Sequence, residues 1–295
     1  MAYELSGSGL LIPRTVATLQ GELPQLAGAV ITEYQDLSSP ENRRFQMQPT
    51  AVEEHTPKWQ LGWHEFDIVT HCIRSDEMYT DVLPGLLEEW GMLDQVYSRL
   101  EDKIDGVSRR ELLRPTFLLH DIGKFAVRKP DDKRGGVTFA GHEVASGQII
   151  RSDLVDERLE QAGLSPGHRA FFARGGELHY ELGHVRKAAK ADKDSAGYSI
   201  KFTQSDTFKA AVNKLIDKNP DFGVEIALLF LGDNLSKTQT RLDVHDDQEL
   251  DSLKEQVWEY QAMLGRPELV PAVLQLPVNV AVGRESLRLA LNRAA

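Results

Sequence analysis

The segment from Phe117 to Lys124 (FLLHDIGK) constrains the fold more than any other part of the sequence. Three apolar residues lead directly into His120 and Asp121, so an imidazole and a carboxylate end a stretch that favours burial. Burying a carboxylate is strongly unfavourable unless it is hydrogen-bonded, ion-paired or bound to a metal. Because His and Asp can both bind one divalent cation, the fold must bring partner groups to this pair. Lys124 follows Asp121 by one helical turn, where its ammonium could meet an anionic substrate.

Further candidate partners lie in other segments with helical patterns. His64 and His71 are seven residues apart, which places them on one face of a helix. His142 opens a long helical pattern, and His179 follows in a separate segment. Another apolar run ends in the lone carboxylate of Asp233. Metal-competent residues therefore recur along the chain in the order His, His-Asp, His, His, Asp.

Apolar residues recur at steps of three and four through most of the chain, which predicts helices. The clearest example runs from Val82 to Leu93, with acidic residues between the apolar ones. Ser108 and Glu111 have the spacing of a capping box, which starts a helix. That helix would carry His120 and Asp121. We therefore expect an all-α fold.

The sequence divides into three parts. Residues 1–58 carry no chemical motif, and we expect a mostly helical N-terminal extension, interrupted near Gly21 and Pro24, that packs on the core. Residues 59–265 form the main helical domain. Residues 266–295 form a C-terminal tail with a short helix.

Two segments are expected to lack helical structure. Residues 274–282 could be extended, with the short helix of the tail following them. The polar segment 186–199, rich in Lys, Ala and Asp, is predicted to be an exposed loop or a mobile lid.

Composition narrows the range of partners. The net charge of −11 disfavours a long nucleic acid, whose phosphates are bound chiefly by Lys and Arg, but it still allows a small anionic substrate beside a local cation. The longest apolar stretch falls far short of the ~20 residues that span a bilayer, so no membrane partner is expected.

The single cysteine, Cys72, cannot form an internal disulfide and is predicted to be a small buried residue. This cysteine usage and the lack of a secretory signal at the N-terminus favour the cytoplasm.

In its pattern of histidines and aspartates the sequence resembles the HD-domain metal-dependent phosphohydrolases. The resemblance covers roughly residues 60 to 240 and rests on His71, the His120-Asp121 pair and Asp233. The stretch from His120 to Glu143 is similar to the HD region of bacterial tRNA nucleotidyltransferases. The polymerase head of those enzymes is not matched, because no Gly-Ser followed by an Asp-x-Asp pair lies upstream. The Glu-Asp pair typical of stringent-response hydrolases is also missing, since Gly123 and Lys124 follow the His-Asp pair.

The resemblance implies an HD-domain helical bundle that holds one or two ions of Mn, Mg, Ni, Co or Fe. Its implied ligands are His71, His120, Asp121 and Asp233, with His142 and His179 as additional members. The implied activity is hydrolysis of a phosphomonoester or phosphodiester of a small molecule, a nucleotide or cyclic nucleotide, by metal-activated water. Asp121 would orient the water, while Lys124 and His142 would contact the phosphate, His142 as a proton donor. Asp67 and Glu143 would fix ligand imidazoles.

Several alternatives remain open at this level. His64 competes with His71 for the role of first ligand, and His184 competes with His179. Six ligands could also hold two irons, as in HD-type di-iron oxygenases. A site that binds a nucleotide without turnover would make the protein a sensor module. The sequence predicts neither the native metal nor the oligomeric state.

Overall fold

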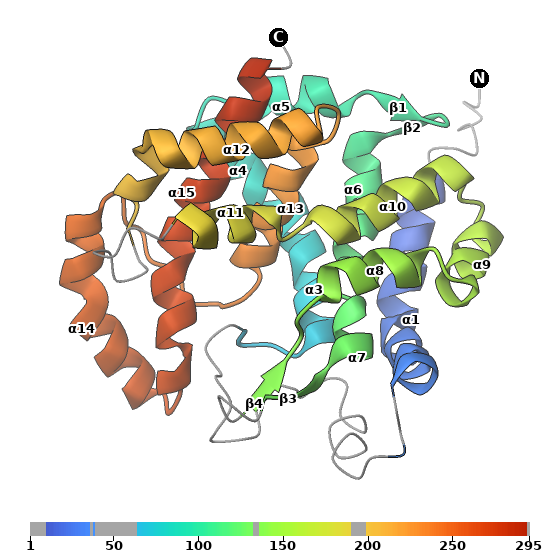
Figure 1. Cartoon of the computed structure of the whole chain (residues 1–295), viewed down its shortest axis with the longest axis horizontal. Helices are drawn as coiled ribbons and strands as arrows, with labels where there is room; N and C mark the ends of the chain where they lie inside the picture. Colours follow the sequence, from blue (N-terminus) through green and yellow to red (C-terminus); the bar gives the residue numbers. More distant parts are fainter. Residues whose placement is uncertain (1–9, 36–37, 39–63, 132–135, 190–198, 294–295) are drawn as a thin grey trace, which may run out of the picture.

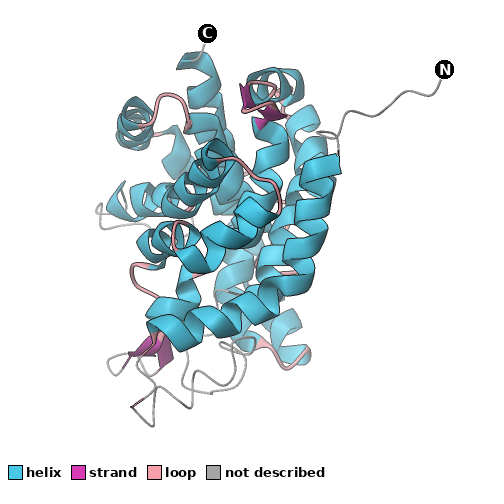
Figure 2. Ribbon diagram, turned by 90° about the vertical axis from the view of Figure 1, so that its right-hand side faces the viewer, coloured by secondary structure: helices cyan, strands magenta, loops and turns pink. Residues whose placement is uncertain are grey.

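The computed structural model is built almost entirely of helices (Figure 1). It describes residues 10–35, 38, 64–131, 136–189 and 199–293. Within these ranges the only strands form two short antiparallel hairpins, β1 (Lys103–Ile104) with β2 (Val107–Ser108) and β3 (Lys129–Asp131) with β4 (Gly136–Thr138). Figure 2 shows the two hairpins at opposite ends of the molecule. The predicted all-α fold is confirmed.

The helix α1 (Leu11–Tyr34) lies along the main helical body and packs against α6 (Arg109–Leu119) and α7 (Gly123–Val127). Its inner face is apolar, and Leu23 and Val30 are completely buried in the core. The helix continues through Gly21 and Pro24, so the expected interruption there is wrong. Burial of the apolar face on both sides of Pro24 outweighs the lost backbone hydrogen bond. The expected domain boundary at residue 58 lies outside the described residues.

Four further helices surround the point where the candidate ligands meet. They are α3 (Ile68–Glu77), α8 (His142–Ile150), α10 (Pro166–Leu178) and α13 (Gly223–Leu235). All 13 residues of α13 are buried, which makes it the central helix of the core. The helix α6 begins at Ser108, whose hydroxyl accepts from the backbone of Glu111, and the predicted capping box is present. The remaining elements complete the outer layer: η2 (Met78–Val82), α4 (Leu83–Glu89), α5 (Leu93–Leu100), α9 (Asp153–Gln161), α11 (Glu181–Ala189), η3 (Lys201–Gln204), α12 (Asp206–Lys218), α14 (Asp247–Met263) and η4 (Pro267–Leu269).

The C-terminal part is one long helix, α15 (Val270–Arg293), which packs against α13. The expected extended stretch at residues 274–282 and the short helix after it are therefore wrong. Valines in a helix cost less than about 0.7 kcal/mol each and Pro277 about 3 kcal/mol. Each apolar side chain that is buried contributes about 1.5–3 kcal/mol. Leu276 and Val282 are buried in the core that contains α13, and Val278 is buried in a second cluster with Leu250 and Val257 of α14. Tertiary packing thus overrides local propensity.

The segment 186–199 also differs from its expected form. Helix α11 continues to Ala189, and Arg186 is buried in it rather than placed on an exposed loop. Residues 190–198 lie outside the described part of the chain. Among the described helices, none has the length and apolar content that crossing a membrane would require.

Candidate metal centre

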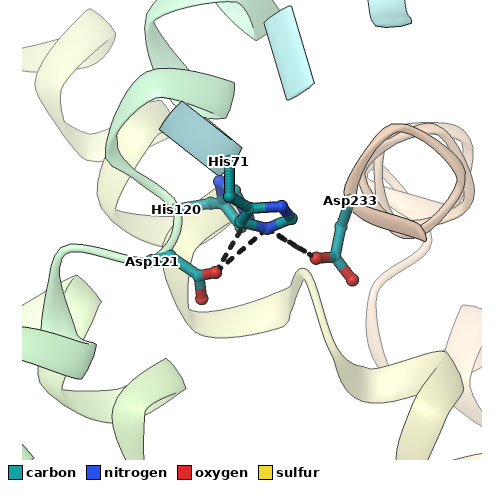
Figure 3. A group of neighbouring side chains, drawn as sticks. All are labelled: His71, His120, Asp121 and Asp233. Atoms are coloured by element: carbon teal, nitrogen blue, oxygen red, sulfur yellow. Dashed lines mark hydrogen bonds and ion pairs between the residues drawn. The ribbon is translucent and has the colours of Figure 1, made fainter. Parts of the chain in front are cut away.

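Four of the candidate ligands converge on one point in the core. His71 comes from α3, His120 and Asp121 from the end of α6, and Asp233 from α13 (Figure 3). One nitrogen or oxygen atom of each residue lies within 4.8 Å of the corresponding atoms of the other three. His71 Nε2 is 3.2 Å from Asp121 Oδ2 and 3.1 Å from Asp233 Oδ1. All four residues are buried, so this group could hold a metal ion.

A second group of three ligands shares Asp121 with the first. His142 Nε2 and His179 Nε2 lie 3.3 Å and 3.4 Å from Asp121 Oδ1. The other oxygen, Oδ2, faces His71 and His120 at 3.2 Å and 3.3 Å. Asp121 therefore presents one oxygen to each group, which is the geometry of a carboxylate that bridges two positions. The structure brings together all six residues that the sequence singled out as metal ligands.

Local sequence explains how these side chains reach the centre. Helix α6 ends at Leu119, and His120 and Asp121 occupy the turn before α7, where both side chains project from the helix end. Gly141 has φ of +82°, a left-handed conformation that suits glycine, and it starts α8 so that His142 is the first helical residue. His179 caps the C-terminal end of α10.

Three of the imidazoles are oriented by their own backbone. The Nδ1 atoms of the three histidines lie 2.6–3.0 Å from the carbonyl oxygen three residues earlier in the chain, in the pairs His120–Phe117, His142–Phe139 and His179–Gly176. Since a carbonyl oxygen only accepts, each Nδ1 carries the proton and donates it. Nε2 is then the nitrogen of each ring that faces Asp121, and in its unprotonated form this nitrogen could bind a metal.

The fourth imidazole, that of His71, is held by a side chain instead. The Ser236 hydroxyl donates to the Asp233 carbonyl oxygen (2.7 Å), and its oxygen lies 3.0 Å from His71 Nδ1, from which it accepts. Ser75 Oγ lies 2.8 Å from the same hydroxyl and donates to the His71 carbonyl oxygen. Asp67, which we expected to fix an imidazole, instead caps α3 by accepting from the Thr70 backbone and hydroxyl.

We expect Ser236→Ala to lower metal affinity about 10- to 100-fold, because partners that orient ligand imidazoles contribute on this scale. Titration of the purified protein with Mn²⁺, followed by calorimetry, measures the change. Ser252→Ala, an exposed serine on α14 bonded only to its own helix, is the matched control. Equal affinities in the two variants would contradict the assigned role of Ser236.

Three buried atoms at the centre lack a normal hydrogen bond. Within the described part of the chain, His120 Nε2 and both carboxylate oxygens of Asp121 are buried without one, although ion-pair contacts surround them. Such atoms are rare in folded proteins because burying them without a partner is unfavourable. Imidazole nitrogen and carboxylate oxygen are the donors that divalent transition metals accept. The residues present therefore fit a metal ion.

Two lysines lower the pKa of the two carboxylates at the centre. Burial opposes ionisation of Asp121, but Lys124, with Nζ 2.7 Å from Oδ2, and the His120 imidazole outweigh it and hold the pKa of Asp121 well below its usual value. Burial likewise opposes ionisation of Asp233. Lys237, with Nζ 2.8 Å from Oδ2, is the chief group that outweighs burial and holds the pKa of Asp233 well below its usual value. Both carboxylates are therefore ionised and available as ligands at neutral pH.

The structure distinguishes between the competing histidines. His64 lies outside both ligand groups; its ring meets His71 edge-on, with 4.3 Å between centroids, and its Nε2 is 3.2 Å from Lys124 Nζ. His184 is half exposed and faces Glu143 and Glu181, whereas His179 is buried at Asp121. His71 and His179, rather than His64 and His184, are thus the members of the two groups that could hold a metal ion.

The sequence reasoning missed two residues that the structure places at the centre, Ser236 and Lys237. Lys237 lies one helical turn after Asp233, a spacing at which opposite charges meet, and this signal could have been used. Ser236 carried no such signal, because its role depends on the approach of α3 to the end of α13.

The close approach of α7 and α8 depends on Gly123. A Cβ atom at this position would lie 2.2 Å from the His142 carbonyl oxygen and 2.4 Å from the Ser146 backbone nitrogen. We expect Gly123→Ala to push α8 away, at a cost of about 1–3 kcal/mol in unfolding free energy, and to weaken binding in the group of His142 and His179. Urea denaturation and metal stoichiometry measure the two effects. Gly85→Ala, where a Cβ has open space, serves as control, and unchanged stability in Gly123→Ala would refute this packing argument.

Comparison with models of known protein families and with curated protein sequences finds no match. The chemistry of the site rests on the geometry described above.

Proposed function

We propose that the protein is a metal-dependent phosphohydrolase acting on a small phosphorylated molecule. The observation that carries this proposal is the position of Asp121, whose two oxygens face two separate sets of imidazoles deep in the core. Paired ligand sets that share a carboxylate suit the displacement of a group at phosphorus, where both the attacking and the leaving oxygen need stabilisation. The order of the candidate ligands along the chain resembles that of HD-domain phosphohydrolases, which supports the same function.

The ligand residues of the first position would be His71, His120, Asp121 and Asp233, and those of the second Asp121, His142 and His179. A bound divalent metal lowers the pKa of water and polarises a phosphoryl oxygen. The ionised carboxylate of Asp121 can orient the attacking water by accepting a hydrogen bond from it. Lys124 places a positive charge 2.7 Å from that carboxylate, where it can bind a phosphoryl oxygen. His142, the most exposed of the four imidazoles at 13%, can donate a proton to the leaving oxygen.

The substrate class follows from charge and resemblance. With a net charge of −11 the chain disfavours a long nucleic acid, whereas the local cations Lys124 and Lys237 favour a small anion. A nucleotide or cyclic nucleotide is the substrate implied by the resemblance to the HD-domain enzymes. We also propose a cytoplasmic location, because the only cysteine, Cys72, is a buried free thiol.

The test is hydrolysis of phosphomonoesters, cyclic nucleotides and nucleoside di- and triphosphates in the presence of Mg²⁺, Mn²⁺, Co²⁺ or Ni²⁺. Phosphate release that needs a metal and stops with a chelator is the expected result. Folded, metal-loaded protein that hydrolyses nothing in the panel would refute the proposal. Binding of a nucleotide without turnover would identify a sensor module instead.

A second candidate function is a di-iron oxygenase. The observation that favours it is the second ligand group, because six residues with one shared carboxylate match the donor types of a pair of irons. Anaerobic loading with Fe(II), followed by measurement of oxygen uptake with candidate polyols, separates the two functions. Uptake without phosphatase activity would establish the oxygenase.

A further inference from the structure

His64 lies in the core next to the candidate metal ligands but belongs to neither ligand group. Its ring meets the His71 ring edge-on, with 4.3 Å between centroids. On its other side, His64 Nε2 lies 3.2 Å from Lys124 Nζ. The roles proposed for the metal ligands leave this buried contact between an imidazole and an ammonium unexplained.

Chemistry decides which group donates in this contact. Lys124 Nζ forms an ion pair with Asp121 Oδ2 at 2.7 Å, and an ammonium carries three hydrogens and no lone pair. Lys124 is therefore the donor, and His64 Nε2 must accept from it. An imidazole that accepts through Nε2 is neutral and carries its proton on Nδ1. The lysine thus contacts one charged acceptor and one neutral acceptor, which come from different parts of the chain.

Hydrogen bonds anchor the backbone that follows His64. Glu65 donates its backbone N–H to the Lys237 carbonyl oxygen over 2.7 Å, and its carboxylate accepts from the Gln239 backbone over 2.7 Å. Asp67 then caps α3 by accepting from the Thr70 backbone. The short segment that starts at His64 is therefore tied both to the chain after α13 and to the start of α3, which limits how far the imidazole can move.

Lys124 needs a second acceptor because its carboxylate partner is also a candidate metal ligand. Asp121 Oδ2 lies 2.7 Å from the ammonium and 3.2 Å from His71 Nε2, so the lysine and a metal ion would share one oxygen. The ammonium would be repelled by an ion bound there, since like charges oppose each other at close range. A lysine stem is flexible, so a repelled ammonium could move away. His64 Nε2 lies outside both ligand groups and can keep the ammonium in place.

We propose that His64 is a positioning residue that holds the Lys124 ammonium at the metal centre, where the ammonium binds a phosphoryl oxygen of the substrate. The inference rests on the proposed function, since it takes the role of Lys124 from it. His64 acts through Lys124, neither as a metal ligand nor as a proton carrier.

Anion binding by the Mn²⁺-loaded full-length protein tests the proposal without turnover. Calorimetry with methylphosphonate, which is not hydrolysed, measures affinity in the wild type, His64→Leu, Lys124→Gln and the double variant. We expect His64→Leu to weaken binding about tenfold, the scale of a hydrogen bond to a charged group. Because His64 acts through Lys124, adding His64→Leu to Lys124→Gln should change the affinity by less than about twofold.

Three results of this cycle would overturn the proposal. The first is full affinity in folded His64→Leu, and the second is a double variant in which the two losses multiply. The third is a metal-loaded wild type that does not bind methylphosphonate, because the ammonium would then bind no phosphoryl oxygen.

Conservative variants separate hydrogen bonding from packing. Glutamine can place its amide oxygen near the position of His64 Nε2, so His64→Gln should keep the affinity within about threefold of the wild type. The shorter His64→Asn should lose as much as His64→Leu, and it replaces that variant if the leucine protein does not fold. His245→Leu, at a histidine whose side chain is 73% exposed, is the matched control. Equal losses in His64→Gln and His64→Asn would mean that the ring only fills space, which contradicts the proposal.

Metal content distinguishes a positioning residue from a ligand. Elemental analysis after dialysis should find the same amount of metal per chain in the wild type and in every His64 variant, because His64 lies outside both ligand groups. Loss of metal in folded His64→Gln would make His64 a ligand and refute the proposal.

Failure of this inference and failure of the proposed function give different results. Non-additive losses of methylphosphonate binding in a protein that hydrolyses nothing would support His64 as the residue that positions Lys124 and refute the phosphohydrolase. Hydrolysis combined with additive losses would leave the phosphohydrolase standing and overturn the role of His64.

Discussion

Replacement of Asp121 by Asn is expected to reduce metal-dependent phosphate release by at least about 10³-fold, which corresponds to a loss of about 4 kcal/mol of transition-state stabilisation. The reason is that Asp121 faces both ligand groups, so one substitution weakens both positions. The amide also removes the negative charge that balances Lys124 at 2.7 Å. The same variant should bind less metal per chain, as measured by elemental analysis after dialysis.

The matched control for this prediction is Asp251→Asn, an exposed aspartate on α14 that pairs with Lys254. It has the same change of charge and shape at a residue outside both ligand groups, and it should retain activity and metal content. If Asp121→Asn retained full metal content, the bridging role that we assign to this carboxylate would be wrong.

Replacement of Phe117 by Ala is expected to lower the unfolding free energy by about 3–5 kcal/mol, the range for a large aromatic side chain removed from a packed core. Phe117 is completely buried, and its ring packs against Gly232 of α13, one residue before the ligand Asp233. A Cβ on Gly232 would lie 2.5 Å from Phe117 Cε1, so Gly232→Ala alone should cost about 1–3 kcal/mol. Urea denaturation of each variant measures these values.

The double variant makes the packing argument specific. Once Phe117 is Ala, the space that its ring occupied can accept a methyl group at residue 232, so Gly232→Ala should add little further cost. The expected coupling between the two sites is at least about 1 kcal/mol, which exceeds the usual deviation from additivity at distant sites. Strictly additive costs would show that α13 does not approach α6 through this contact.

Three members of the candidate ligand groups are marked locally in the sequence, so their burial at one site could be predicted. His120 and Asp121 end an apolar run, and Asp233 ends another, so burial of a metal-competent group could be inferred at both places. Helix starts such as Ser108 are equally local, since a capping box lies within four residues. Features of this kind depend on neighbours in sequence rather than on the assembled core.

Features that depend on contacts between segments far apart in the chain could not be predicted from the sequence. The helix α15 forms in spite of Pro277 and several valines, because the apolar face of α13 is available to cover it. Ser236 holds His71 only because α3 and the end of α13 lie side by side, and Arg186 donates to Gln275 only because α15 packs beside α11. No local pattern contains that information.

The position of the ligands along the chain has a consequence for stability. His71 and Asp233 are separated by 162 positions, and the segments between them form most of the central core. An ion shared by these residues would act as a cross-link that is present only in the folded chain. By mass action, an ion at 100 times its dissociation constant would add about 2.7 kcal/mol to the unfolding free energy of the whole domain. Metal supply would then set the lifetime of the protein as well as its activity.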